Sequence, residues 1–587
     1  MKNVTSKFLI PLAWAALLAS CSINTSTSIS PSSGTASSTS TSTSTSKTST
    51  STSSTSSSSV SFSSDTVQGD FSITTEDGAY SEDSGVYTIT AAGSYELAGK
   101  LAGQIVVNAG DEDAVELTLN GASITYGVNS PIYVVNADEV KIKAKKETVN
   151  FVTDTREEQT EDDDTQGGGA IYADADLKFG GQGTLTVTGG YNNGIHTTKD
   201  LKIQKLTLNV AAPNNAIKGN DSVNVETGNV TAVSYAGDAI KSSSTDLSSS
   251  SKQRGDVNIY GGTLNLYAGC DGIDAAYNLN IYNAADEDDP SVTNVSTINI
   301  WTNKYSSYSS SSVLAAYTNL EYAPGGGGPG GNPGGNPGGG MPGGSQTADK
   351  AEDSAKGLKA ANGIYISGGV TSIYAYDDGV HANSGDTFES GAKGIGAITV
   401  SGGTLNVTCS DDGLHADGTL SISGGNINVL ESHEGLEGNV ITVSGGESVI
   451  YGQDDAVNAS TSIKVTGGYL FACVPSNGDT DGIDSNGSYE QTGGTVITCG
   501  PNSEMAAAVD TDGAVKISGG TLIVFGMLAR NPTTYSGVTT SSLSGTYGSK
   551  AYTVTFESGS VQTGKLLSYN YSSCRCYSVL GKVSSCA

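Results

Sequence analysis

Paired glycines recur at nearly even steps through the second half of this 587-residue chain, and this repeat limits the possible fold more than any other feature. The first glycines of successive pairs are Gly402, Gly424, Gly445, Gly467, Gly493 and Gly519, at steps of 22, 21, 22, 26 and 26 residues. A period in this range indicates a solenoid. Between the pairs, apolar residues alternate with Thr, Ser and Asn, as in Leu420-Ser421-Ile422, which is the periodicity of a β-strand.

A second marker repeats in phase with the glycine pairs. It is a small residue, then Ile, Val or Leu, then a variable residue, as in Gly194-Ile195-His196 and Gly413-Leu414-His415, and it occurs thirteen times. About 22 residues per period allow three short strands and three turns, whereas a propeller blade needs ~40 residues and a helical repeat ~34. We therefore predict an all-β fold, a parallel β-helix of about 13 coils that stack ~4.8 Å apart.

The first residues have the pattern of a bacterial lipoprotein signal. Lysines and an apolar run precede Leu18-Ala19-Ser20, which stands directly before Cys21. We expect Cys21 to be lipidated and to anchor the protein outside the cytoplasm, to the cell membrane or outer membrane, with its domain at the cell surface. The predicted layout is a signal peptide at 1-20, a Ser/Thr-rich tether at 21-65, the β-helix at 66-525 with a Gly/Pro-rich loop at 323-350, and a C-terminal cap or tail at 526-587.

The charge balance excludes some classes of partner. Lys and Arg number 29 against 60 Asp and Glu, which gives a net charge of −31 and argues against nucleic-acid binding. Beyond the first twenty residues, no apolar run is long enough to span a bilayer. We expect a monomer whose only contact with the membrane is the lipid.

The cysteines and histidines do not predict a zinc site. No pair of cysteines has Cys-x-x-Cys spacing, and the four histidines are far apart in the sequence. Cys473 and Cys499 occupy equivalent positions on successive coils, so their separation permits a disulfide, although buried free thiols are the more frequent outcome and the one we expect.

The variable residue of each marker is predicted to point outward, because the preceding Ile, Val or Leu points into the core. Stacked coils then place these residues in one line, which we call the outer column. The outer column reads Tyr133, Tyr172, His196, Lys218, Lys241, Asp274, Lys359, His381, His415, Glu437, Asn458, Asp484 and Asp510.

Carboxylates in and just before the markers suggest a calcium-binding array. Like charges on neighbouring coils repel unless a cation lies between them, and Ca²⁺ takes six to eight oxygen ligands. The predicted calcium ligands are Asp271, Asp274, Asp377, Asp378, Asp411, Asp412, Asp481 and Asp484. The alternative is that these residues are solvated turn aspartates, because Asp and Gly suit tight turns.

The basic residues of the outer column allow two explanations. Lys218, Lys241 and Lys359 flank Asp274 and either neutralise nearby aspartates or, together with calcium, bind the carboxylate of a sugar acid. On the second explanation, the predicted carbohydrate-binding residues are Lys218, Lys241, Lys359, His381 and His415.

The repeated strings resemble one family. Asp411-Asp412-Gly413-Leu414-His415-Ala416 and Ala355-Lys356-Gly357-Leu358-Lys359-Ala360, with the Ser-Gly-Gly turns and the Gly/Pro-rich insertion, are similar to bacterial carbohydrate-binding proteins of the pectate-lyase-like superfamily. The resemblance covers roughly Asn120 to Phe525. It implies a right-handed β-helix that binds calcium and plant-type polysaccharides, including polygalacturonate.

Two other functions stay open. The strings Asp271-Gly272-Ile273-Asp274 and Asp481-Gly482-Ile483-Asp484 also look like the calcium-binding cluster of pectate lyases, in which Lys241 or Lys359 would be the base. The whole chain has only four arginines, so the arginine-rich cleft of many such lyases is absent and binding is favoured over catalysis. The third possibility is an adhesin that presents its loops to another cell.

Overall fold

The computed structural model describes residues 62–157, 168–286, 289–302, 354–503, 505–548, 551–567 and 569–587. Cys21, the signal at 1-20, nearly all of the tether at 21-65 and the insertion at 323-350 lie outside these residues. The regular secondary structure assigned to the described part consists of β-strands, which confirms the all-β prediction. Its residues include no helix with the length and apolar character needed to cross a bilayer.

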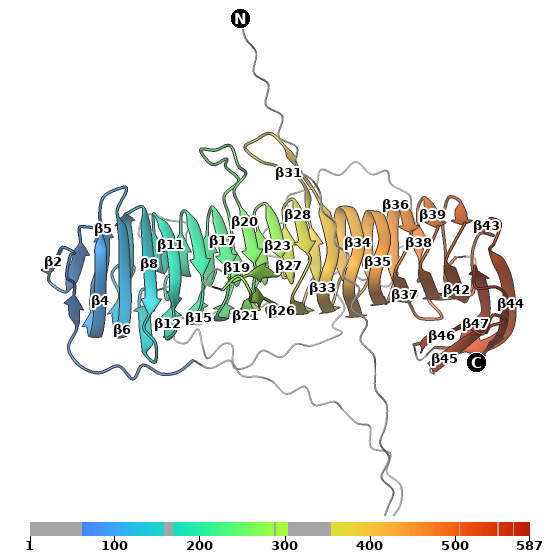
Figure 1. The fold of residues 1–587 in the computed structure, drawn as a ribbon, viewed down its shortest axis with the longest axis horizontal. Helices are drawn as coiled ribbons and strands as arrows, with labels where there is room; N and C mark the ends of the chain where they lie inside the picture. Colours follow the sequence, from blue (N-terminus) through green and yellow to red (C-terminus); the bar gives the residue numbers. More distant parts are fainter. Residues whose placement is uncertain are drawn as a thin grey trace, which may run out of the picture. The chain divides into compact units, whose positions relative to one another are not determined.

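Most strands form three parallel ladders, each of which pairs a strand with its equivalent on the next coil (Figure 1). The first ladder carries the markers and contains β3 (Val86–Ile89), β5 (Gln104–Asn108), β7 (Ile132–Asn136), β10 (Gly169–Ala173), β13 (Asn193–Thr197), β16 (Ile217–Gly219), β19 (Ile240–Lys241), β22 (Ile273–Ala275), β27 (Leu358–Ala360), β30 (Val380–Ala382), β34 (Leu414–Glu431), β35 (Leu436–Tyr451), β36 (Val457–Val465) and β38 (Asp484–Ser485).

The second ladder follows each marker strand along the chain. It contains β4 (Gly93–Ala102), β6 (Ala114–Tyr126), β8 (Glu139–Ala144), β11 (Asp176–Gly181), β14 (Asp200–Ile203), β17 (Ser222–Val225), β20 (Asp256–Ile259), β23 (Asn278–Ile281), β28 (Gly363–Ile366), β33 (Ala397–Cys409), β39 (Ser488–Gln491), β41 (Val515–Ile517) and β43 (Thr533–Thr534), together with parts of β34 to β36.

The third ladder completes each coil. It contains β9 (Val149–Asp154), β12 (Thr184–Thr188), β15 (Thr207–Ala212), β18 (Asn229–Ser234), β21 (Gly262–Ala268), β26 (Ser296–Thr302), β29 (Val370–Ala375), β37 (Tyr469–Cys473), β40 (Thr495–Cys499) and β42 (Thr521–Phe525), with parts of the long strands β4, β6 and β33 to β35. Three strands per coil and parallel pairing match the predicted solenoid, whose right-handedness stays a prediction.

Each glycine pair has two separate physical roles at its turn. Gly425 has a φ of 82°, in the left-handed region where a side chain is strained. A Cβ on Gly424 would lie 2.3 Å from the carbonyl oxygen of Ser401 on the preceding coil. The first glycine therefore allows close stacking and the second allows the turn.

The core is a continuous column of aliphatic side chains inside the coils. The apolar residue of each marker is at most 1% exposed, from Ile132 through Ile273 to Val509, as the alternating pattern predicts. The marker ladder continues past the first predicted coil, because β5 and β3 pair in register ahead of β7.

Insertions leave the coils between equivalent strands. The pairing of Asp274 with Lys359 is direct, although 84 residues lie between them. Two insertions meet beside the first ladder, where the backbone N–H of Glu389, between β31 (Ser384–Thr387) and β32 (Lys393–Ile395), donates to Thr245 across 3.2 Å. Figure 1 shows both projecting from the same side of the coils. A third insertion carries the short hairpin β24 (Ala284–Ala285) and β25 (Thr293–Asn294).

Antiparallel strands close both ends. At the N-terminal end, β1 (Ser72–Thr74) pairs with β4, and β2 (Tyr80–Asp83) pairs with β3. At the other end, β44 (Thr539–Tyr547) and β42 pair with β47 (Tyr571–Ser578), while β45 (Ala551–Phe556) pairs with β46 (Val561–Lys565) and β48 (Val583–Cys586). The last segment, for which the sequence showed no repeat, thus covers the open end of the third ladder.

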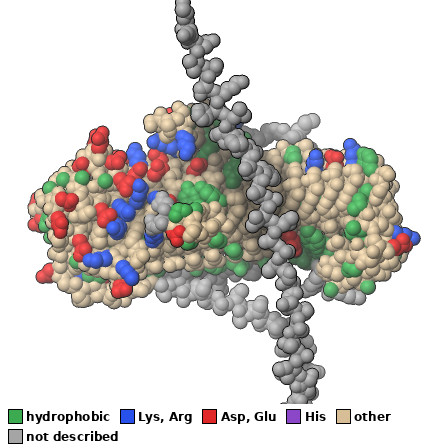
Figure 2. Space-filling model, viewed as in Figure 1, with side chains coloured by type: hydrophobic (Ala, Val, Ile, Leu, Met, Phe, Trp, Pro, Cys, Tyr) green, Lys and Arg blue, Asp and Glu red, His purple; other side chains and the backbone are tan. Residues whose placement is uncertain are grey.

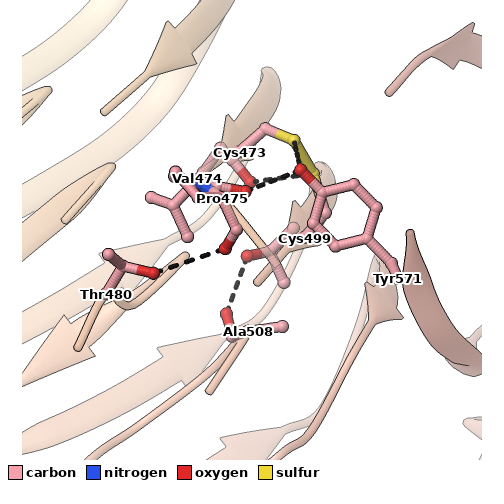
Figure 3. The surroundings of a disulfide bond; sticks show 9 residues. Cys473, Val474, Pro475, Thr480, Cys499, Ala508 and Tyr571 are labelled. Carbon is pink, nitrogen blue, oxygen red and sulfur yellow. Dashed lines mark hydrogen bonds between the residues drawn. A yellow bond between two sulfur atoms is a disulfide. The ribbon is translucent and has the colours of Figure 1, made fainter. Parts of the chain in front are cut away.

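Cys473 and Cys499 form a disulfide between neighbouring coils, so our expectation of free thiols was wrong (Figure 3). The two residues face each other in register on β37 and β40, which brings their side chains together. The Tyr571 hydroxyl donates to the Val474 carbonyl across 2.6 Å and lies 3.4 Å from the Cys473 sulfur. The C-terminal strands therefore pack directly on this disulfide.

Charged side chains are unevenly distributed over the surface. In the view of Figure 2 they gather on the N-terminal coils and are sparse on the C-terminal coils. Cross-coil ion pairs account for part of this on the second ladder, where Lys143 lies 3.0 Å from Glu116 and Lys202 lies 2.6 Å from Glu226.

Candidate functional site

The outer column exists as predicted. The register places Tyr133 beside Tyr172, Lys241 beside Asp274, and His381 beside His415. These residues flank buried apolar residues of the first ladder, so their side chains point away from the core. The structure thus brings together all five predicted carbohydrate-binding residues, Lys218, Lys241, Lys359, His381 and His415, along one line.

A second line of polar residues runs beside the outer column, two positions before each marker's apolar residue. We call it the inner row, and it reads Asn193, Asn215, Asp238, Asp271, Lys356, Asp378, Asp412, Glu434, Asp455 and Asp481. Six of its side chains accept a hydrogen bond from a backbone N–H of the following coil, namely Asn215, Asp238, Asp271, Asp378, Asp455 and Asp481. For example, Asp238 Oδ1 accepts from Asp271 N–H at 2.9 Å, and Asp455 Oδ1 accepts from Asp481 N–H at 2.8 Å. One oxygen of each such carboxylate therefore continues the ladder, and the other faces the outer column.

Lysines neutralise the carboxylates in the middle of the array. This lysine section comprises Asp238, Lys241, Asp271, Asp274, Lys356, Lys359 and Asp377. Lys241 Nζ lies 2.6 Å from Asp238 and 2.7 Å from Asp274, and Lys359 Nζ lies 3.2 Å from Asp271. Burial alone would lower the pKa of Lys241, but the two aspartates outweigh burial and raise it.

Lys356 replaces an aspartate in the inner row. Its Nζ lies 2.6 Å from Asp377 and 3.2 Å from Asp378. Our sequence prediction assigned no role to this lysine, although its position two residues before Leu358 is the one that aspartate fills on neighbouring coils. The register of the repeat is the sequence signal that places Lys356 in the inner row.

Two histidines follow the lysine section. This imidazole section comprises Asp378, His381, Asp412, His415, Asp417 and Glu437. The rings of His381 and His415 stack with centroids 4.3 Å apart and planes 7° apart. Burial opposes protonation of His415, but hydrogen bonds to Asp412 and Glu437 outweigh it and raise its pKa to about 11. The expectation that the histidines are far apart is wrong for this pair, because the coils stack residues 34 positions apart in the sequence.

In the last coils the outer column and the inner row carry carboxylates but no lysine. This acidic section comprises Glu434, Asp455, Asp481, Asp484 and Asp510, and no ion pair with lysine or arginine involves these residues in the described part of the chain. Burial raises the pKa of Asp455 to about 8 and that of Asp481 to about 7, and neighbouring carboxylates add to both shifts. Burial and Asp510 also raise the pKa of Asp484. Among the described residues no lysine or arginine lies close enough to these groups to stabilise their charged forms.

The predicted calcium ligands therefore divide into groups. Ion pairs with lysine hold Asp271, Asp274, Asp377 and Asp378, and His415 lies 2.9 Å from Asp412. Asp481 and Asp484 belong to the acidic section, whose donor set fits a hard cation because Asp455 and Asp481 each keep an oxygen outside the backbone ladder. Asp411 precedes Asp412 at this turn, and partial burial of its carboxylate raises its pKa, with further contributions from Asp378 and Asp377.

Two known proteins are similar in sequence to parts of this chain. A solved structure described as the polysaccharide lyase-like protein from C. thermocellum, a gadolinium derivative, is 32% identical and covers 39% of this chain and 86% of that one, with a TM-score of 0.33. A carbohydrate-binding domain-containing protein of Acetivibrio thermocellus is 38% identical over 126 residues, which are 21% of this chain and 44% of that protein. The chain thus spans less than half of this relative's length.

A family description matches far more of the chain than either relative. The model of the family described as carbohydrate-binding domain-containing protein matches residues 82–397, 384–435 and 395–479. These segments include the outer column from Tyr133 to Asn458 and cover more than half of the sequence. The chain belongs to the family of carbohydrate-binding domain-containing proteins.

Proposed function

We propose that this protein binds an acidic polysaccharide, such as polygalacturonate or another plant cell-wall glycan, along the outer column and that calcium mediates the binding. The observation that carries the proposal is the unbroken line of outward polar residues within a carbohydrate-binding family. A rise of ~4.8 Å per coil offers repeated weak contacts to an extended chain, and their avidity can exceed any single contact.

Calcium has a specific role in this proposal. A protein of net charge −31 repels a polyuronate, so binding needs a local reversal of sign. The lysines Lys241 and Lys359 are largely neutralised by their own aspartates. We therefore assign the calcium to the acidic section, where Asp455, Asp481, Asp484 and Asp510 would supply oxygen ligands and leave coordination positions for uronate oxygens.

Catalysis by a lysine base is the less favourable alternative. A general base must lose its proton near neutral pH. Burial favours the neutral form of Lys359, but Asp271 and Asp274 outweigh burial and raise its pKa above the ordinary value. Lys241 is held in the charged form in the same way by Asp238 and Asp274. The raised pKa values favour the protonated forms of both candidate bases, which argues against either lysine as a general base.

The cellular location is also part of the proposal. The lipoprotein pattern before Cys21 and the Ser/Thr-rich tether would place the β-helix at the cell surface, on a lipid anchor in the cell membrane or outer membrane. The Cys21→Ala substitution should release the protein from the membrane, so that it appears in the soluble fraction when the cells are fractionated.

Affinity electrophoresis in gels that contain polygalacturonate tests the binding. With calcium the protein should be retarded, and a chelator should abolish the shift. Asp481→Asn/Asp484→Asn should reduce the retardation, whereas Glu447→Gln/Glu490→Gln, an equal change of charge at exposed positions outside the outer column, should not. Retardation that persists in chelator, or that neutral glucans alone produce, would contradict the proposal.

A further inference from the structure

A cavity of about 170 Å³ lies at the corner between the second and third ladders. Its described lining comes from the turns after β14, β17 and β20 and from the hairpin β24–β25, whereas the outer column lies on the first ladder. The hairpin approaches the coils closely at Gly261, where an added Cβ would lie 2.7 Å from the Cβ of Asn294. The insertion therefore builds one wall of a concave site on a face that the outer column does not occupy.

The backbone at the edge of this cavity is strained at Lys205. The next coil turns here with a glycine, Gly228, in the left-handed region, but Lys205 has a φ of 69°. The Leu206 N–H donates to the Gln204 carbonyl at 2.9 Å, which makes Lys205 the central residue of a γ-turn of the rare, strained kind. The Lys205 N–H donates to Thr227 Oγ1 at 3.0 Å and holds this turn. Strained residues cluster at ligand sites, so a lysine in this conformation favours a binding role.

The cavity combines an aromatic ring with groups that form hydrogen bonds. Tyr260 packs edge-to-face against Tyr282, with ring centroids 4.8 Å apart, and its hydroxyl donates to Asn224 Oδ1 at 3.3 Å. These contacts hold the Tyr260 ring in place. On the hairpin, Asn294 Nδ2 donates to Asp286 Oδ2 at 3.3 Å, and the oxygens of both side chains keep lone pairs that can accept from a ligand.

Among the described residues, the charges around this cavity largely cancel. Lys202 Nζ lies 2.6 Å from Glu226, while Lys205 and Asp286 supply one charge of each sign. The site therefore offers no excess charge to a strongly charged ligand, but it offers both donors and acceptors to hydroxyl groups. Its volume suits a single six-membered ring, because a cavity of about 150 Å³ in another protein holds benzene.

We propose that this cavity binds one uncharged sugar ring of a polysaccharide. The apolar C–H face of the ring lies against Tyr260, and its hydroxyl groups bond to Lys205, Asp286 and Asn294. An apolar wall with a few polar groups is the usual composition of a small-ligand site. The site uses neither calcium nor the outer column, so its test is independent of calcium-dependent retardation by polygalacturonate.

Saturation-transfer NMR titration of the mature protein in chelator tests the proposal. The probes are the methyl glycosides of glucose and galactose, with galacturonic acid as the charged comparison. We expect at least one neutral glycoside to bind with a dissociation constant in the millimolar range and galacturonic acid to bind more weakly. Tyr260→Ala removes the aromatic wall and Ala284→Leu fills the cavity, so each should weaken the binding about tenfold.

Two further variants separate loss of the site from loss of the fold. Lys205→Gly should weaken the binding without lowering the melting temperature, because glycine adopts a positive φ without strain. The matched control is Tyr365→Ala, at an outward tyrosine of the second ladder outside the cavity lining, and it should leave the affinity unchanged. The site is overturned if neither glycoside binds, if galacturonic acid binds more tightly than both, or if Tyr260→Ala and Ala284→Leu keep the affinity of the wild type.

Discussion

The lysine section and the acidic section share the same backbone hydrogen-bonding pattern, but the negative charge of their carboxylates is compensated differently. In both, a carboxylate oxygen accepts a backbone N–H from the next coil, as Asp238 does for Asp271 and Asp455 does for Asp481. The outward oxygen of Asp238 has Lys241 within 2.6 Å, whereas the described part of the chain provides no lysine for Asp455. Stacked carboxylates thus support the fold in both sections, but of the two only the lysine section balances their charge with its own lysines.

This difference indicates where an external cation is needed. Charges ~4.8 Å apart repel strongly where water is partly excluded. In the lysine section, Lys241 lies between Asp238 and Asp274 and removes their repulsion, and its ammonium group takes the position that a metal ion between them would occupy. In the other section no lysine lies beside Asp455 or Asp481 among the described residues, and burial, followed by neighbouring carboxylates, raises the pKa of both. The following predictions test the contrast, from the largest expected effect to the smallest.

Removal of Lys241 should cause the largest loss of stability. Lys241→Met leaves Asp238 and Asp274 without their partner, and breaking a buried ion pair costs about 3–5 kcal/mol, which we reduce to about 2–4 kcal/mol because the lysine is partly exposed. Hydrogen exchange should show the loss in β16, β19 and β22. Lys464→Met, at an exposed lysine of the second ladder, should change little. Failure of Asp274→Asn to recover part of the loss would contradict the ion-pair explanation.

Reduction of the disulfide should weaken the acidic section and its cap. Cys473 and Cys499 are 26 positions apart in the sequence, and the chain-entropy account gives about 3 kcal/mol for a loop of this length. A reductant should lower the melting temperature of the wild type and have no effect on Cys473→Ser/Cys499→Ser. Equal melting of the reduced and oxidised wild type would show that the strands hold these coils without the bond.

Chelation of calcium should destabilise the acidic section alone. An ion that binds only the folded state contributes about 2.7 kcal/mol at a concentration 100 times its Kd. The melting temperature should therefore fall in chelator for the wild type and for Asp274→Asn, but not for Asp481→Asn/Asp484→Asn. A calcium response that is lost in Asp274→Asn instead would place the ion in the lysine section.

Acidification should produce the smallest effect, through His196. Burial lowers the pKa of this histidine to about 3, with Lys218 adding to the shift, so the unfolded state binds its proton first as the pH falls below about 6.5. The stability contribution is complete above pH 6.5 and is lost towards pH 3, at about 1.4 kcal/mol per pH unit, or roughly 2 kcal/mol between pH 8 and pH 5.

The measurement is the difference in unfolding free energy between the wild type and His196→Gln across this range. The difference should shrink as the pH falls, while His433→Gln, at an exposed histidine, should follow the wild type. A constant difference from pH 8 to pH 5 would mean that the pKa of His196 is the same in the folded and unfolded states. The buried Nδ1 of His196 has no hydrogen-bond partner among the described residues, which favours the neutral form.

The sequence alone determined to which coil each marker residue belongs and whether its side chain points into the core or outward. Periodicity depends only on local geometry: Gly425 must turn with positive φ, and Leu414 must alternate inward while His415 points outward. The repeated marker then predicted that residues such as His381 and His415 lie in register, although an insertion puts them 34 positions apart. These predictions needed no knowledge of side-chain contacts.

Only the tertiary structure decided which charges meet and at what distance. Nothing in the spacing of the chain required Lys356 to lie between Asp377 and Asp378, the sulfurs of Cys473 and Cys499 to bond, or Asp417 to turn towards two imidazoles. Those outcomes depend on rotamers, on the hairpin that positions Ser384, and on tenths of an ångström between neighbouring coils. The repeat determines where the backbone of each residue lies, and packing determines where the atoms at the end of its side chain lie.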